Sequence, residues 1–220
     1  MSDGPSQSVV DPRDERVIHR LEAFSDIVIG FSLALLAINL IAPQSVAEIP
    51  GHATELATFF VCFFLIAFLW WFHNRVFAHL YVASVGSIVL NIAMLAGVVM
   101  LVYTAQIVSN VAKAVHPFDV HGYVLALSLW LGIYGVVLVL LGGMAAIGLR
   151  ARWTEVSDPV RRWGLKQSIN GLVGGAVVVL IGVLMPRLPI AYAGFVSLLA
   201  FATLIVERYL VPRLIARAAT

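Results

Sequence analysis

Asp26 is the ionisable residue that lies deepest in the first apolar stretch of the chain. This stretch covers residues 20–42, RLEAFSDIVIGFSLALLAINLIA, and no charged residue follows Asp26 there before Pro43. An unpaired carboxylate in such a stretch is costly, so Asp26 needs hydrogen-bond donors or a neighbouring ion. A carboxylate beside a histidine such as His73 can relay protons, and an apolar helix face can line an ion pathway. Both kinds of chemistry are open at this point.

Hydrogen-bond donors that can reach Asp26 are scarce in the other apolar stretches. Most of them gather between Trp70 and Asn74, at the end of the second stretch, and Asn91 lies in the third. If consecutive stretches run antiparallel, these donors lie at the height of Asp26, so we favour a structural hydrogen-bonded cluster over a proton relay. The predicted cluster, in which the carboxylate holds the histidine, consists of Ser25, Asp26, Trp71, His73 and Asn74.

One face of the first stretch is wholly apolar. At 100° per residue, six apolar side chains fall within about 60° of Phe31, whereas Asp26 points behind this stripe. Such a stripe on a membrane helix commonly faces lipid or other helices. Less commonly, it lines an ion pathway. The apolar stripe consists of Phe24, Ile27, Phe31, Ala34, Leu35 and Ile38.

The composition places all these residues in a membrane protein. Of the 220 residues, 61% are hydrophobic and 12% are charged, and the mean hydropathy is +0.96. An average soluble domain has about 25% charged residues. The net charge of +2 sets orientation and does not indicate nucleic-acid binding, and the single Cys62 excludes an intrachain disulfide.

Six apolar stretches predict an all-α membrane protein with six transmembrane helices. Their lengths suit a hydrocarbon core of roughly 30 Å. We expect a mobile cytoplasmic tail over residues 1–15, a six-helix transmembrane domain over 16–212 and a cytoplasmic tail over 213–220. A re-entrant hairpin in place of the last two helices also fits. The predicted helices cover residues 20–42, 56–72, 82–108, 123–149, 165–185 and 188–210.

The basic residues predict the orientation of these helices. With six helices, twelve of the 14 Lys and Arg residues fall on one side of the membrane. Basic residues collect on the cytoplasmic side, so we expect both termini there, in the cell membrane. An odd number of helices would place Arg208, Arg213 and Arg217 outside. The first stretch is too long for a signal-peptide core, so we expect it to remain uncleaved.

The segment RLEAFSD resembles the Arg-x-x-x-Phe-Ser-Asp signature that opens the first helix of the transmembrane protein 175 family of potassium channels. Trp71–Phe72–His73–Asn74 lies where that family carries its second-helix partners for the signature. The single six-helix layout is similar to that of bacterial members of the family. The signature residues here are Arg20, Phe24, Ser25 and Asp26.

The resemblance implies a homotetrameric cation channel with the first helix of each copy on the axis. Its constriction would consist of hydrophobic side chains, with Phe31 at the narrow point and Ala34 where the family commonly has Thr. Ala34 offers no hydroxyl to a dehydrating cation and Phe31 is bulky, so preference for K⁺ over Na⁺ is open and the pore can gate by dewetting. No cofactor or bound metal is implied beyond permeant monovalent cations. The pore-lining residues implied are Ile27, Phe31, Ala34, Leu35 and Ile38.

Two other classes of protein were weighed against a channel. A secondary transporter or proton-coupled carrier would use Asp26 and His73. Such a protein typically has broken helices and charged groups at the midplane, which the sequence does not clearly show. A membrane-embedded enzyme would want HExxH, GxSxG or paired intramembrane acids, which the sequence lacks, so we do not expect an enzyme.

Three smaller features have simpler interpretations. His116, Asp119 and His121 are capable of binding metal, but a solvated loop is the favoured interpretation. Gly171-x-x-x-Gly175 predicts a close-packing helix surface. The link WTEVSDPVRRW, residues 153–163, is expected to rest on lipid headgroups.

Overall fold

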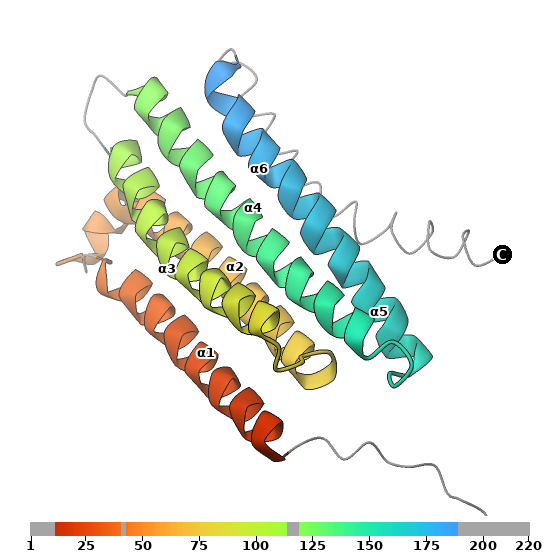
Figure 1. Cartoon of the computed structure of the whole chain (residues 1–220). Helices are drawn as coiled ribbons and strands as arrows, with labels where there is room; N and C mark the ends of the chain where they lie inside the picture. The colour runs from red at the N-terminus through yellow and green to blue at the C-terminus, as the bar shows by residue number, and fades with distance from the viewer. Residues whose placement is uncertain (1–11, 41–42, 114–118, 189–220) are drawn as a thin grey trace, which may run out of the picture.

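The computed structural model describes residues 12–40, 43–113 and 119–188, and within these ranges every regular element is a helix (Figure 1). The chain runs as an up-and-down bundle in which each long helix is antiparallel to the one before it. The elements are α1 (Pro12–Ile38), η1 (Val46–His52), α2 (Ala53–His79), α3 (Val85–Lys113), α4 (Val120–Ala151), α5 (Asp158–Ile169), η2 (Asn170–Gly174), α6 (Gly175–Leu184) and η3 (Met185–Arg187).

The described residues contain five helices that are long and apolar enough to cross a membrane. They correspond to the first five predicted helices, because α5, the π-helical turn η2 and α6 together form one continuous crossing over Asp158–Arg187. The chain is therefore a multi-pass membrane protein. The predicted helix over residues 188–210 lies outside the described residues, except for Leu188.

The helix ends differ from the predicted ones because helices continue past the hydrocarbon core. α1 begins at Pro12, inside the predicted tail, where proline suits the first helical position. It ends at Ile38, short of the predicted end, because Asn39 Nδ2 donates to the carbonyl of Leu35 at 2.7 Å and Pro43 follows. The second predicted helix ends near Phe72, but α2 continues to His79.

The helix α4 occupies the centre of the bundle, between α3 and α6, and α1 lies at one edge against α2 and α3 (Figure 1). The contact between α4 and the fifth crossing is made through glycines. A Cβ on Gly171 would lie 2.5 Å from Gly142 Cα, and one on Gly175 would lie 2.7 Å from the carbonyl oxygen of Gly135. The close-packing surface predicted from Gly171-x-x-x-Gly175 is confirmed.

Candidate functional site

The apolar stripe of α1 faces away from the rest of the bundle. All six of its side chains are exposed, and Phe31 and Ile38 are the most exposed, at 72% and 78%. The other flank of α1 packs on α2 and α3 and is buried. A single copy of the bundle therefore exposes a continuous apolar face that requires lipid or another protein surface as its partner.

The buried residues of α1 recur every three to four positions, as residues on one face of a helix do. It consists of two serines, an isoleucine and a leucine, all 5% exposed or less. The hydroxyls of Ser25 and Ser32 donate to carbonyls one turn earlier in α1, at 2.8 and 2.9 Å, so they need no further partner for their protons. The small side chains allow the neighbouring helices to approach, which fixes the rotation of α1. The buried flank is Ser25, Ile29, Ser32 and Leu36.

A buried hydrogen-bonded chain connects three helices next to Ser25. His73 Nε2 on α2 lies 2.9 Å from Asn91 Oδ1 on α3, and Asn91 Nδ2 donates to Ser25 Oγ at 3.1 Å. All three side chains are fully buried. We call these residues, His73, Asn91 and Ser25, the inner chain.

The donor and acceptor of each hydrogen bond in the inner chain can be assigned by starting from Ser25. Because Ser25 Oγ already donates to Leu21, it accepts from the amide nitrogen of Asn91. The amide oxygen of Asn91 then faces His73, so His73 Nε2 carries the hydrogen and donates. The inner chain is a polar joint between α1, α2 and α3 inside an otherwise apolar core.

Asp26 does not take part in the inner chain. Its Oδ1 accepts from Trp70 Nε1 at 2.8 Å, at the exposed edge where α1 meets α2. The prediction that the carboxylate holds His73 is wrong, because consecutive helical residues point about 100° apart. With Ser25 facing the interior, Asp26 is turned toward the outer side of α2, where Trp70 lies one turn before His73.

Of the two other predicted members of the cluster, Trp71 lies outside it and Asn74 lies beside His73. Trp71 is 47% exposed, and its ring contacts Phe68 and the guanidinium of Arg75. Asn74 is half-buried, and its Oδ1 has no hydrogen-bond partner among the described residues. Arg20, the first residue of the signature, is exposed.

Asn91 is the functional candidate that the predicted cluster left out. A lone amide in the middle of a helix as apolar as α3 is costly unless it is bonded, and this cost is the signal that could have placed it. Its two polar atoms fit between a donor on α2 and an acceptor on α1, so it completes the link that Asp26 was expected to make.

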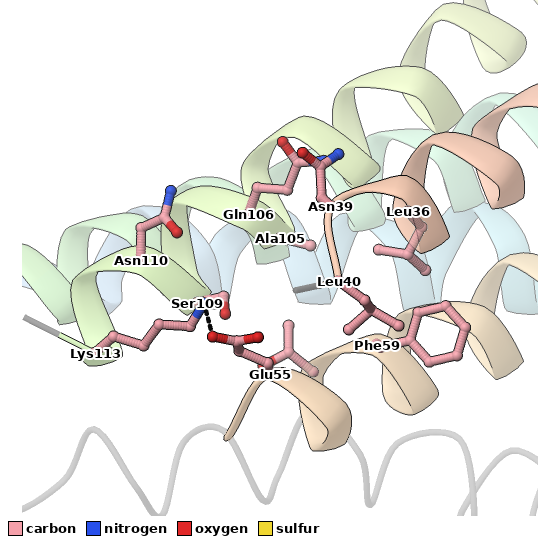
Figure 2. Close-up of a pocket in the computed structure, with 11 residues that line it drawn as sticks. Leu36, Asn39, Leu40, Glu55, Phe59, Ala105, Gln106, Ser109, Asn110 and Lys113 are labelled. Atoms are coloured by element: carbon pink, nitrogen blue, oxygen red, sulfur yellow. Dashed lines mark ion pairs between the residues drawn. The ribbon is translucent and has the colours of Figure 1, made fainter. Parts of the chain in front are cut away.

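A polar cavity of about 90 Å³ lies at the opposite end of α1 (Figure 2). Asn39 and Leu40, which directly follow α1, meet the start of α2 and the end of α3 there. Glu55 forms an ion pair with Lys113, and His52 Nδ1 lies 3.2 Å from the same carboxylate. Gln106 Nε2 is buried at the cavity without a hydrogen-bond partner among the described residues. The cavity has polar lining groups and is large enough to hold water.

An ion pair beside this polar cavity joins the start of α2 to the end of α3. Glu55 begins the second crossing and Lys113 ends the third, so antiparallel packing brings an acid and a base of distant sequence together at one height. The pair is visible in the sequence only if the helix ends are known, which is why charge counting alone missed it.

The remaining predicted metal candidates do not form a site in the described part of the chain. Asp119 caps α4 by accepting from the backbone nitrogen of Gly122 at 2.9 Å. His116 lies outside the described residues. Among those described, no group of three His, Cys, Asp or Glu side chains could hold a metal ion.

Comparison with known families gives one match. The family described as endosomal/lysosomal potassium channel TMEM175 matches residues 20–101, from the start of the signature to within α3. The matched region contains the apolar stripe, the inner chain and the Asp26–Trp70 bond. No curated protein and no solved structure matches the chain.

Proposed function

We propose, from the match of residues 20–101 to a potassium-channel family, that this chain is a subunit of a cation channel whose pathway runs between copies of α1. The family is one of channels and not of enzymes. The five membrane-length helices supply the multi-pass layout that a channel needs. The proposal adds the pathway itself, its hydrophobic constriction and its ions.

The orientation of α1 is the observation that carries the proposal. The helix lies at the edge of the bundle and keeps its buried flank on α2 and α3, so the apolar stripe is free to meet other copies. If several copies were arranged around an axis next to α1, their apolar stripes would face one another. In a homotetramer the pathway would be lined by Ile27, Phe31, Ala34, Leu35 and Ile38.

Phe31 would form the narrowest part of this pathway. It is the largest side chain in the middle of the stripe, and no oxygen ligand stands next to it at Ala34. A narrow apolar ring expels water, and an ion that has lost its hydration shell there gains no replacement ligands. Conduction would therefore require the ring to widen enough for a hydrated ion, which favours modest discrimination between K⁺ and Na⁺.

The proposed assembly has six crossings in each copy and both termini on the cytoplasmic side of the cell membrane. Twelve of the 14 basic residues then lie on that side, as is typical of the cytoplasmic face. The sixth crossing would be supplied by residues 188–210.

A proton-coupled carrier using Asp26 and His73 is the second candidate. The two side chains belong to separate hydrogen-bonded groups, since Asp26 bonds Trp70 and His73 bonds Asn91. Neither an indole N–H nor an amide N–H exchanges protons readily enough to connect them. The geometry therefore favours the channel.

Recording from purified protein in planar bilayers tests the proposal. A channel gives unitary currents that carry far more ions per second than a carrier cycle, and the reversal potential in mixed K⁺ and Na⁺ reports the preference between them. Flux that is seen only with a proton gradient, without unitary events, would replace the channel with the carrier.

A further inference from the structure

A second feature, unrelated to the ion pathway, is a groove on the outside of the bundle between α2, α4 and α5. Its volume is about 450 Å³. The floor of the groove is apolar, and one end carries polar groups from the last turn of α5 and from η2. Its floor includes Leu65, Phe68, Leu69, Leu138 and Leu141, and its polar end is formed by Lys166, Gln167 and Asn170.

Lys166 brings an uncompensated positive charge to this groove. Its side chain is half-buried, and among the described residues it forms no ion pair. The nearby link uses its acids elsewhere, because Asp158 pairs with Arg161 and Glu155 with Arg152. A half-buried ammonium at the edge of a membrane protein is stabilised by an anion, and the residues that the structure describes supply none here.

A second polar group at the same end also lacks a partner. Asn170 Oδ1 is buried and accepts no hydrogen bond from the described residues, and Asn170 begins the π-helical turn that interrupts the fifth crossing. Such turns are frequent at functional sites because they redirect side chains. The turn leaves an amide beside the ammonium, so the polar end offers both a charge and a hydrogen-bonding group.

The height of the groove matches the boundary between headgroups and acyl chains. Its polar end lies toward the end of the bundle where α2 and α4 finish and α5 begins (Figure 1). Trp71 lines the groove there, and Trp163 lies nearby with Arg75 between the two rings, 5.3 and 4.7 Å from their centroids. Tryptophan and arginine are typical of this interfacial layer.

We propose that the groove holds one anionic phospholipid of the leaflet at the basic end of the bundle. Its phosphate would lie at Lys166, a hydroxyl of its headgroup would donate a hydrogen bond to Asn170 Oδ1, and an acyl chain would cover the leucines and Phe68. An anionic lipid fits better than a zwitterionic one, because a zwitterion would bring an ammonium of its own to a site where the described residues supply no free acid. The site would stabilise the contact between α2 and the fifth crossing, whichever ions the protein conducts.

Fluorescence of the whole protein in lipid nanodiscs tests the proposal, with Trp71 as the reporter. Brominated phosphatidylglycerol or brominated phosphatidylcholine is included at equal mole fraction, and the Trp71→Phe variant gives the share of the signal that comes from this residue. We expect stronger quenching of Trp71 by the anionic lipid. Lys166→Gln should weaken that preference roughly five-fold, whereas Lys166→Arg should retain it.

Arg150→Gln is the matched control, because Arg150 is an exposed cation at the same end of the bundle and lies outside the groove. It should leave the preference of Trp71 for the anionic lipid unchanged. Equal quenching by the two lipids in the unmodified protein would overturn the proposal, as would an equal loss in Arg150→Gln and Lys166→Gln. Absence of quenching by either lipid would also overturn it and would point to residues 189–210 as the occupant.

Discussion

Trp70 Nε1 lies 2.8 Å from Asp26 Oδ1, and this bond joins the exposed edge of α1 to α2. The residue just before Asp26, Ser25, bonds Asn91 of α3 in the interior. Two consecutive residues of α1 are therefore held by two different helices. Together they fix both the position and the rotation of the helix that carries the apolar stripe.

Loss of the Asp26–Trp70 bond should weaken assembly and leave the inner chain in place. Asp26→Ala and Trp70→Phe remove the two ends of the same bond, so each should lower the fraction of assembled protein, measured by size-exclusion chromatography with light scattering. The double variant should be little worse than the single ones. If Asp26→Ala kept the assembly intact and abolished only a pH dependence of transport, the proton-relay interpretation would gain.

Asn91→Leu should destabilise the bundle by about 1–3 kcal/mol, because it leaves the His73 Nε2 hydrogen buried without an acceptor. Equilibrium unfolding in detergent micelles measures this loss. Ser128→Ala is the control, since Ser128 is also buried and its hydroxyl bonds only the carbonyl of Val124 within α4. Equal losses in the two variants would show that the inner chain is not a joint between helices.

Gly142→Ala should destabilise the contact between α4 and the fifth crossing by about 1–3 kcal/mol. Its new methyl group would lie 2.7 Å from Gly171 Cα, and backbone cannot give way as a side chain can. Gly132→Ala, on the same helix, meets no heavy atom within 4 Å and should be tolerated. Thermal stability in detergent compares the two variants, and equal stability would contradict the close packing.

The sequence was sufficient to predict the helical membrane class, the first five crossings and the glycine surface. Each of these depends on local composition or on spacing along one helix. The partner of His73 was not predictable in the same way, because it depends on the rotation of α1 relative to α2 and α3. Asp26 is charged and Asn91 is neutral, but Asn91 faces the interior and Asp26 does not. The partner of His73 is therefore the less polar of the two groups.

The middle of the fifth crossing illustrates the same limit. The π-helical turn over Asn170–Gly174 has no clear signal in a run of small and apolar residues, since it depends on how closely Gly171 approaches α4. The lining of the groove beside it is drawn from three helices and follows from that packing. The sequence pattern along one helix shows which of its residues are apolar. Which polar groups are left without partners depends on how the helices pack against one another.

Tyr81, in the link between α2 and α3, should make the fold sensitive to alkali. Burial raises its pKa from 10.0 to about 12. Between these values the unfolded chain loses the phenol proton and the folded one keeps it, so stability is present below pH 10 and is lost as pH rises toward about 12. Unfolding in detergent across this range should show a smaller loss for Tyr81→Phe than for the unmodified protein.

Tyr103→Phe is the control for this alkaline loss, because Tyr103 is 56% exposed on α3. At neutral pH, Tyr81→Phe should be at least as stable as the unmodified protein, since its hydroxyl is buried without a hydrogen-bond partner among the described residues. An alkaline loss that is identical in both variants would assign the effect to other groups.

The apolar stripe of α1 is proposed to line the ion pathway, and the accessibility of cysteines placed on it can test this. Cys62 is the single cysteine of the chain, so Cys62→Ala provides the background. In that background, Phe31→Cys places a thiol on the stripe, and Phe64→Cys places one on an α2 phenylalanine that is 65% exposed. With a thiol-reactive cation such as Ag⁺ during bilayer recording, we expect current through Phe31→Cys to be blocked irreversibly and current through Phe64→Cys to be unchanged. Unaltered current through Phe31→Cys, or equal block of the two variants, would contradict a pathway along α1.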